Sequence, residues 1–274
     1  MNRYKETKEC QNCFNLFIGD KECCSQKCYT DYNDFKRRKK RMKIIPQHIC
    51  IQMDGNRRYA KKFNKNPLWG HTKGGENLEK IIKHCRKLGI KYLTFFALSI
   101  ENLKRSREEL RHHFNLHKKY IKKLIVKNDN FVKRGIRFRV LGNKKLLPKD
   151  EQKLIRKAEN KTKGCDKYFL NFCIAYSGRE EIIQAIKKII KSKIPSKKIN
   201  EKLVKTFLYT NGIPEPEMMI KTGMNPEKRL SGFLLWDVAY TELFFSSTLW
   251  AEFTPRELDE MIIEFNMRER RFGK

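Results

Sequence analysis

Short apolar runs alternate along this chain with segments whose apolar residues recur every three or four positions. One apolar run covers residues 48–53, and residues 90–98 form another that is rich in β-branched and aromatic side chains. The segment between them has apolar residues at helical spacing, namely Leu78, Ile81, Ile82, Cys85 and Leu88. Strands that alternate with helices predict an α/β domain with a mostly parallel central sheet flanked by helices.

The later part of the chain repeats this alternation. Ser106 and Glu109 form an S-x-x-E capping box, and apolar residues follow it on one helical face. Residues 136–140 alternate like a strand with one solvated face, and residues 168–182 read as a strand, a small residue and a helix. Thr254 then precedes a proline at the first turn of a final helix.

The end of the first predicted strand carries residues suited to an anion and a metal. Asp54 follows the apolar run, and ligands of α/β sheets gather at that edge. Gly55 permits close approach of the backbone to an anion, and Arg57 and Arg58 offer charge-assisted hydrogen bonds to phosphate. Magnesium commonly takes one or two carboxylates plus substrate phosphates. The alternative is an ordinary strand followed by an Asp-Gly turn.

Two more polar groups accompany predicted element boundaries. The glycine-rich segment 70–75 contains His71 and precedes the helical pattern, where backbone amides suit anion binding. Ser99, Glu101 and Asn102 follow the strand predicted at residues 90–98. In the alternative interpretations, His71 and Asn102 only cap helices.

The chain is strongly basic. Its 274 residues include 62 Lys and Arg against 31 Asp and Glu, which leaves a formal net charge of +31. This balance indicates a polyanionic partner: phosphorylated substrates, an anionic membrane surface or nucleic acid. A lysine-rich proteome is the alternative. No apolar run is long enough to span a membrane, and the first ten residues lack the apolar segment of a signal peptide. We therefore expect a cytoplasmic protein that can lie peripherally on a membrane.

The amino-terminal region is rich in cysteine. Five of the nine cysteines fall between residues 10 and 28, and two close pairs suit tetrahedral zinc: Cys10 with Cys13, and Cys24 with Cys28. We predict a small structural zinc module at residues 1–35, followed by a basic linker at residues 36–45 and a main domain at residues 46–274. A zinc module beside a basic run also fits a nucleic-acid-binding protein, and an unstructured tail with incidental cysteines is the third alternative.

The segment 48–60 resembles the signature H-x-A-x-x-M-D-G-N-x-R-[WFY]-A of the cis-prenyltransferases, the family of undecaprenyl and dehydrodolichyl diphosphate synthases, with Cys50 in place of alanine. Further blocks follow in the family's order: GHTKG at 70–74, SIENLKR at 99–105, YSGR at 176–179, RLSGF at 229–233 and YTELFF at 240–245. The resemblance implies a Mg²⁺-dependent enzyme that condenses isopentenyl diphosphate with an allylic diphosphate, farnesyl or geranylgeranyl, to a Z-polyprenyl diphosphate. It also implies a homodimer, and a hydrophobic tunnel between the helices that start near Glu76 and Ser106.

The same resemblance assigns roles to individual residues. The catalytic residues would be Asp54, Ser99 and Asn102, and Asp54 would share magnesium with Glu242, from the same chain, from the partner subunit or through water. The diphosphates and the primer would be held by Gly55, Asn56, Arg57, Arg58, Tyr59, His71, Glu101, Leu103, Arg105, Lys221, Arg229, Leu230 and Ser231.

Two departures from the family pattern concern the second diphosphate site. Lys221 stands where the family has arginine, and about two extra residues lengthen the turn before Arg229. Lysine keeps the charge but loses the bidentate fork of arginine. A non-catalytic subunit of a heteromeric synthase is the alternative function, although the aspartate block around Asp54 is retained. The sequence fixes neither the product length nor the primer.

Overall fold

The computed structural model describes residues 7–9, 16–18, 25–123, 130–224 and 226–269. The chain divides into two compact units, one formed by residues 1–45 and 256–270 and the other mainly by residues 46–255. The larger unit contains the sheet that the alternation of strands and helices predicts.

The larger unit is built on a six-stranded parallel sheet with the order β5-β6-β4-β3-β7-β8. Its strands are β3 (His48–Gln52), β4 (Tyr92–Ser99), β5 (Ile136–Leu141), β6 (Tyr168–Tyr176), β7 (Met218–Lys221) and β8 (Glu242–Phe245). In the middle of the sheet, Ile49 of β3 is in register with Leu93 of β4 and Met218 of β7. The predicted α/β class with a parallel sheet is confirmed.

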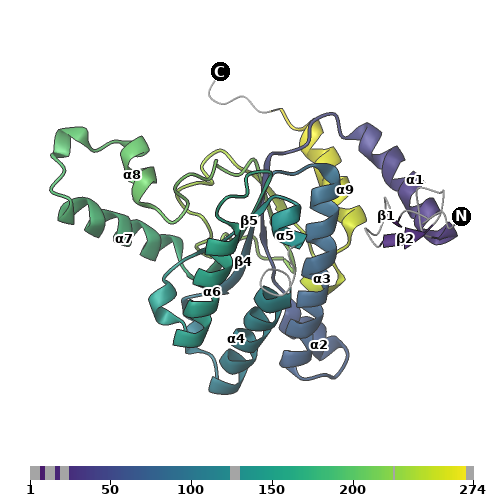
Figure 1. The fold of residues 1–274 in the computed structure, drawn as a ribbon, viewed down its shortest axis with the longest axis horizontal. Coiled ribbons are helices and arrows are strands. Elements are labelled where there is room, and N and C mark those ends of the chain that lie inside the picture. Colours follow the sequence, from purple (N-terminus) through teal and green to yellow (C-terminus); the bar gives the residue numbers. More distant parts are fainter. Residues whose placement is uncertain (1–6, 10–15, 19–24, 124–129, 225, 270–274) are drawn as a thin grey trace, which may run out of the picture. The chain divides into compact units, whose positions relative to one another are not determined.

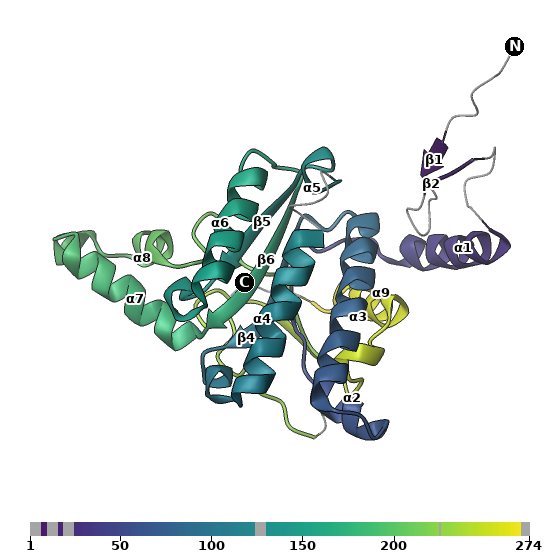
Figure 2. The ribbon, with the colours of Figure 1, turned by 60° about the horizontal axis from the view of Figure 1, so that its bottom comes forward.

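Helices flank this sheet. Their bounds are α2 (Asn56–Lys62), α3 (Pro67–Leu88), α4 (Arg107–Ile121), α5 (Asn130–Lys133), α6 (Lys149–Thr162), α7 (Gly178–Lys191) and α8 (Glu201–Phe207). Short 3₁₀ helices lie at Glu101–Lys104, Lys144–Leu146, Ser196–Lys198 and Trp250–Glu252. Helices α3, α4 and α6 lie side by side over one face of the sheet, while α7 and α8 project at its side (Figures 1 and 2). No helix among the described residues is long and apolar enough to cross a membrane.

Helix α3 begins earlier than the sequence pattern suggests. The side chain of Asn66 caps it by accepting a hydrogen bond from Leu68 N, and Pro67 occupies its first turn. The glycine-rich segment therefore lies inside the helix, where glycine permits close packing against α2. A Cβ at Gly70 would lie 2.0 Å from Asn56 O, and one at Gly74 would lie 2.5 Å from Asn56 Oδ1. The expectation that these glycines precede the helix is wrong.

The core of the sheet is apolar and contains two thiols. Ile49, Cys50 and Ile51 of β3 are fully buried, as is Cys173 of β6. Burial raises the pKa of both thiols well above its usual value, and the negative charges of Asp237 and Glu181 contribute to the rise. These cysteines therefore pack as small apolar side chains.

The smaller unit contains α1 (Gln26–Arg41), α9 (Pro255–Met267) and the antiparallel strands β1 (Thr7–Glu9) and β2 (Leu16–Ile18). Arg38 of α1 donates to Asp259 of α9 at 2.7 Å. Ser25 caps α1, whose last turn is basic, so the basic run continues the helix instead of forming a linker. Of the predicted zinc ligands, Cys28 lies in α1, while Cys10, Cys13 and Cys24 lie outside the described residues.

Candidate active site

A polar cleft of about 900 Å³ lies at the carboxyl ends of β3, β4 and β6. It is bordered by the turn after β3, the residues after β4, the first turn of α7 and the loop at 231–235. Predicted site residues that line it are Asp54, Gly55, Asn56, Arg57, Arg58, His71, Ser99, Glu101, Asn102, Arg105 and Ser231. The parallel sheet thus brings together residues that lie far apart in the sequence.

The turn after β3 fixes the position of Asp54. Gly55 has a φ of +103°, and its amide donates to Asp54 Oδ1 at 2.6 Å. A Cβ at position 55 would lie 2.8 Å from Leu249 Cδ2, so both space and conformation require glycine. The Asp54 carbonyl accepts from Trp250 N at 2.9 Å, which ties the turn to the segment after β8.

Asp54 and Arg58 face each other across the first turn of α2. Arg58 Nη2 lies 3.6 Å from Asp54 Oδ1 and also donates to the carbonyl of Gly223. Both side chains are about half exposed, so solvent screens the pair and leaves both groups accessible to a ligand. A carboxylate and a guanidinium thus stand together at the floor of the cleft.

The oxygen donors around Asp54 suit magnesium, which prefers oxygen ligands. Gln52 Oε1 and Asn56 Oδ1 are buried and have no hydrogen-bond partner in the described part of the chain. Both residues line the cleft together with the half-exposed carboxylate of Asp54. Because buried polar atoms normally find a partner, these oxygens are available to a cation or to its water shell. The residues present therefore fit a magnesium ion.

Ser99 and Asn102 line the cleft at the carboxyl end of β4. Asn102 N donates to Ser99 Oγ at 3.1 Å, so the serine side chain supports the 3₁₀ turn that follows β4. Ser106 accepts from Glu109 N at 3.3 Å and is the cap of α4, as its S-x-x-E pattern predicts. The interpretation of Asn102 as the cap of that helix is therefore wrong, and so is a capping role for His71, which lies inside α3.

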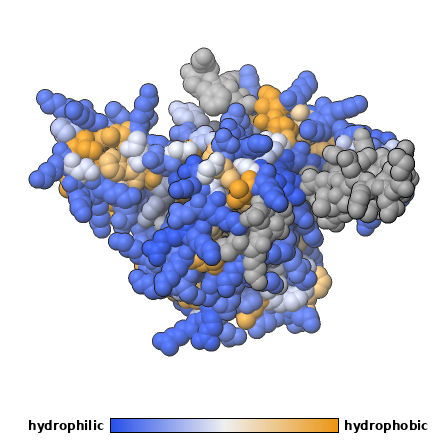
Figure 3. All heavy atoms as spheres, viewed as in Figure 1, coloured by the Kyte–Doolittle hydropathy of each residue, from blue (hydrophilic) through white to orange (hydrophobic). Residues whose placement is uncertain are grey.

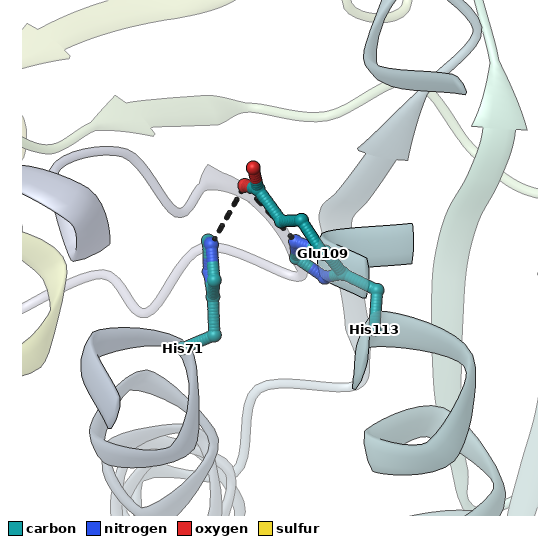
Figure 4. A group of neighbouring side chains, drawn as sticks. All are labelled: His71, Glu109 and His113. Carbon is teal, nitrogen blue, oxygen red and sulfur yellow. Dashed lines mark hydrogen bonds and ion pairs between the residues drawn. The ribbon is translucent and has the colours of Figure 1, made fainter. Parts of the chain in front are cut away.

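His71, Glu109 and His113 form a buried cluster where the cleft meets α3 and α4 (Figure 4), and the partly exposed Arg105 contacts it. Glu109 Oε1 lies 3.2 Å from His71 Nε2 and accepts from Arg105 Nη1 at 2.9 Å. Arg105 Nη1 also lies 3.2 Å from His113 Nε2. Burial lowers the pKa of His71 to about 4 and that of His113 to about 2, and neighbouring positive groups add to the second decrease. Both imidazoles are therefore neutral at pH 7.

Lys221 lies behind the cleft wall instead of in it. Only 2% of its surface is exposed, and its Nζ donates to Arg229 O at 2.7 Å and to Ser231 Oγ at 2.8 Å. Burial lowers its pKa, an effect that Asp54 opposes and that Arg229 and Arg58 reinforce. Of the residues expected to hold the second diphosphate, Ser231 lines the cleft, while Lys221, Arg229 and Leu230 do not.

Three other expected residues lie outside the cleft lining. Glu242 starts β8 and is in register with Met218, whereas Asp54 follows the carboxyl end of β3. Within one chain, Asp54 therefore lies at the carboxyl ends of the strands and Glu242 at their amino ends. An ion shared by both would need Glu242 of the partner subunit. Tyr59 stacks on Trp69 with ring centroids 5.3 Å apart, and Leu103 belongs to the 3₁₀ turn after β4.

The first turn of α7 contributes cleft residues to which the sequence assigned no chemistry. Ser177 and Arg179 both line the cleft, and Arg179 is exposed. The signal was present, because residues 168–182 repeat the order of strand, small residue and helix seen around Asp54. A residue that follows a parallel strand reaches the same sheet edge as Asp54.

A second pocket, mostly apolar, adjoins the cleft and extends between α3, α4 and the sheet. The two cavities share Met53, Asn56, His71, Ala97 and His113. Its other lining residues include Leu78, Leu116, Ile121, Phe131, Phe138, Leu170, Phe172, Ile174 and Trp250. His117 and Tyr120 are its additional polar residues, and His117 Nδ1 contacts Glu151 Oε1 at 2.9 Å. A cleft with charged and polar side chains thus opens into an apolar pocket, the arrangement an enzyme acting on a prenyl diphosphate needs.

Comparisons with known proteins agree with this arrangement. A family model described as "Putative undecaprenyl diphosphate synthase" matches residues 52–273. The tritrans,polycis-undecaprenyl-diphosphate synthase (geranylgeranyl-diphosphate specific) of Pyrococcus furiosus is 40% identical over 250 residues, 90% of this chain and 94% of that protein. The isoprenyl transferase of Fusobacterium nucleatum is 42% identical over 231 residues, 84% of this chain and 97% of that protein.

Solved structures give the same result. The lavandulyl diphosphate synthase of Lavandula x intermedia, in complex with dimethylallyl diphosphate, superposes with a TM-score of 0.78 at 30% identity, covering 84% of this chain and 98% of that one. A probable undecaprenyl diphosphate synthase from Campylobacter jejuni gives 0.69 at 33% identity, covering 84% and 100%. Fold and cleft together define an enzyme that transfers prenyl groups. The chain belongs to the undecaprenyl diphosphate synthase family of cis-prenyltransferases, which confirms the predicted family and transferase class.

Proposed function

We propose that this chain is a magnesium-dependent cis-prenyltransferase that adds isopentenyl diphosphate to an allylic diphosphate and makes a Z-polyprenyl diphosphate. The observation that carries the proposal is the junction of the two cavities at Asn56 and His71. Diphosphates would bind in the cleft while the growing prenyl chain enters the apolar pocket, which serves as the tunnel. The geranylgeranyl specificity in the name of the Pyrococcus relative supports an allylic primer, and farnesyl diphosphate is the other candidate.

The diphosphate group of the allylic substrate would bind, and later depart, at the Asp54 side of the cleft. The Gly55 to Arg58 segment would bind its oxygens through backbone amides and the guanidinium groups of Arg57 and Arg58. Magnesium, when bound, supplies positive charge that neutralises the departing diphosphate. The residues that would hold it are Asp54 and Glu242 of the partner subunit.

The incoming isopentenyl diphosphate would be held by Ser231 and Arg179, which line the cleft, and by Arg229, whose side chain would turn in from outside the lining. Lys221 would act through the turn that it orders. The alkene carbon then attacks C1 of the primer, the C1–O bond breaks with its electron pair leaving on diphosphate, and a proton passes from C2 of the isopentenyl unit to the released diphosphate. Asn102, positioned beside Ser99, would assist this proton loss. Holding both reactants in register is the main contribution of such a site.

Incorporation of labelled isopentenyl diphosphate into extractable product tests this proposal. We expect product with farnesyl or geranylgeranyl diphosphate in the presence of Mg²⁺ and none after chelation. Asp54→Ala should lower the rate by at least about a hundredfold, the scale of losing one electrostatic stabiliser. Asp150→Ala, which removes an exposed carboxylate paired with Lys118, is the control and should leave the rate unchanged. Undiminished product from Asp54→Ala would refute the proposed role of Asp54.

The same assay tests the alternative of a non-catalytic subunit. Such a subunit would give no product alone. The retained cleft residues Asp54, Asn56, Arg58 and Asn102 favour the catalytic function, because they keep the oxygen donors and cations together.

We also propose that the chain forms a homodimer. Helix α7 exposes Ile183, Ile186 and Ile190, and Ile190 is 71% exposed. Figure 3 shows an apolar patch over the projecting α7–α8 region. Large apolar side chains that recur on one helix face are typical of a protein interface. Sedimentation of the purified chain should give a dimer, and Ile186→Lys combined with Ile190→Lys should give a monomer. A monomeric parent would overturn this proposal.

Two further roles rest on the sequence. Cys10, Cys13, Cys24 and Cys28 would hold a structural zinc ion, which metal analysis of the parent and of a four-cysteine-to-serine variant tests. The net charge of +31 would favour contact with an anionic membrane. Binding to anionic but not neutral vesicles, weakening with salt, supports this contact. Tighter binding to duplex DNA would favour the nucleic-acid alternative instead.

A further inference from the structure

Three potential metal ligands meet at the junction between the cleft and the apolar pocket. His71 points inward from α3, and Glu109 and His113 point toward it from α4 (Figure 4). Glu109 Oε1 lies 3.2 Å from His71 Nε2 and 4.0 Å from His113 Nε2. The three ligand atoms all lie within 4.8 Å of one another, and each residue as a whole is at least nine-tenths buried.

The chemistry of this group differs from that of the Asp54 region. An imidazole binds a metal ion only when its nitrogen is deprotonated, and burial keeps both histidines neutral near pH 7. The spacing of Glu109 and His113 by four residues places both on one face of α4. Two imidazoles with one carboxylate suit borderline cations such as zinc and cobalt, whereas magnesium prefers oxygen ligands alone.

We propose that His71, Glu109 and His113 form a binding site for a borderline divalent cation, Zn²⁺ or Co²⁺, distinct from the magnesium site expected at Asp54. Three protein ligands leave a fourth coordination position open, as in zinc sites that admit an exchangeable ligand. His71 and His113 line both cavities. A cation bound there would lie where a prenyl chain passes from cleft to tunnel, so its occupancy would oppose chain elongation.

Arg105 competes with such a cation. Its Nη1 lies 2.9 Å from Glu109 Oε1 and 3.2 Å from His113 Nε2, so the guanidinium occupies the side of the ligands that an ion would approach. Arginine stays protonated in proteins and offers no lone pair to a metal. Arg105 must therefore turn into the cleft, which it already lines, before the ion binds. Its removal should strengthen metal binding, the opposite of the effect expected for losing a ligand.

Titration of the metal-free chain with Co²⁺, followed by its visible absorption, tests this proposal. The background is the 274-residue chain in which Cys10, Cys13, Cys23, Cys24 and Cys28 are replaced by serine, so that thiolates of this region do not contribute. We expect one equivalent of Co²⁺ to bind. His113→Leu should weaken binding at least tenfold, Arg105→Gln should tighten it at least fivefold, and Asn115→Leu, a change at an exposed position of α4, should leave it unchanged.

His113→Gln provides a second loss of the ligand that retains a polar side chain, and circular dichroism checks that each variant is folded. The proposal is overturned by an absence of binding in both the parent and Arg105→Gln. It is also overturned when Arg105→Gln weakens binding or the His113 variants bind like the parent. Because the readout is metal binding, these outcomes do not depend on prenyl transfer.

Discussion

The ammonium group of Lys221 holds the turn at residues 229–231 in place. It donates to Arg229 O and Ser231 Oγ while only 2% of the side chain is exposed. A buried ammonium has lost its hydration, and its hydrogen bonds compensate for only part of that loss. Burial of the Lys221 ammonium is therefore unfavourable for stability, while its hydrogen bond holds Ser231 at the cleft lining.

Lys221→Met should change substrate binding more than stability. The lost donors leave a carbonyl and a hydroxyl unsatisfied at a cost of about 1–3 kcal/mol, and removing a buried charge offsets part of that cost. We expect the KM for isopentenyl diphosphate to rise about tenfold, equivalent to roughly 1.4 kcal/mol, with the KM for the allylic diphosphate unchanged. Steady-state kinetics measure both. Lys228→Met, an exposed change in the same turn, is the control, and equal changes in both KM values would contradict the positioning role.

Individual residues differ in how far the sequence could place them. Asp54, Ser99 and Asn102 follow the ends of apolar runs, and parallel strands bring such residues to one edge. Arg179 carries the same signal. Glu242 is the first residue of β8, so it lies at the amino ends of the parallel strands, away from Asp54. The burial of Lys221 could not be predicted, because it depends on how the turn at 229–231 folds back over β7.

Helices α3 and α4 form the wall of the apolar pocket, and one contact between them narrows it. A Cβ added at Gly75 would lie 2.6 Å from Tyr120 Cε2. Both residues line the pocket. The start of α3 could not be predicted from the apolar spacing. Its glycines suggested a segment before the helix, but Gly70 and Gly74 lie inside the helix, where they allow close packing against α2.

Gly75→Val should shorten the product, and Tyr120→Ala should lengthen it, because one fills the pocket that the growing chain enters and the other opens it. Because each substitution adds or removes several heavy atoms in the pocket, we expect the main product to change in length by about one five-carbon unit. Thin-layer chromatography of the dephosphorylated products against chain-length standards gives the distribution. Gly164→Ala is the control, since a Cβ there meets nothing within 4 Å. Identical distributions in all variants would show that the pocket does not receive the product.

The start of α7 is attached to the loop before β7 through a buried carboxyl. Glu181 accepts from Tyr176 Oη, from Tyr209 N at 2.8 Å and from Thr210 N at 3.3 Å. Burial raises its pKa to about 6, a rise that the hydrogen bond from Tyr176 opposes and that repulsion from Asp237 reinforces. The folded state therefore holds this proton more tightly than the unfolded chain does.

Stability contributed by Glu181 should be fully present at pH 4 and lost as pH rises to about 6, with a total change of about 2 kcal/mol. Glu181→Gln removes this loss, so its stability relative to the parent should be about 2 kcal/mol more favourable at pH 7.5 than at pH 4. Urea unfolding at the two pH values measures the difference. The buried His48, whose pKa burial lowers to about 4, acts in the opposite direction but is common to both proteins. A difference that does not vary with pH would contradict the prediction.

At the scale of the whole chain, the sequence predicted the fold class better than it predicted how the chain divides into compact units. Alternating strands and helices indicated a parallel α/β domain, and the strand-end motifs indicated its family. The grouping of α9 with residues 1–45 could not be foreseen, because it depends on contacts such as that between Arg38 and Asp259, 221 residues apart.

Mixing two inactive chains tests whether two subunits complete one site. Asp54→Ala and Glu242→Gln should each be inactive. After subunit exchange, the mixture should regain about a quarter of parental activity, because half of the dimers then hold one intact pair of carboxylates. Labelled isopentenyl diphosphate incorporation measures the recovery. No recovery, with mixed dimers verified by mass, would mean that Glu242 does not act across the interface.

Alkylation of the buried thiols of β3 and β6 can report how often the sheet opens. Cys50 and Cys173 are fully enclosed, and burial raises the pKa of each thiol, so an alkylating reagent can neither reach nor readily react with them in the closed sheet. Alkylation requires an opening of the strands around them. The rate at which native protein acquires label at these two positions therefore measures how often the centre of the sheet opens, without any probe being added to the chain.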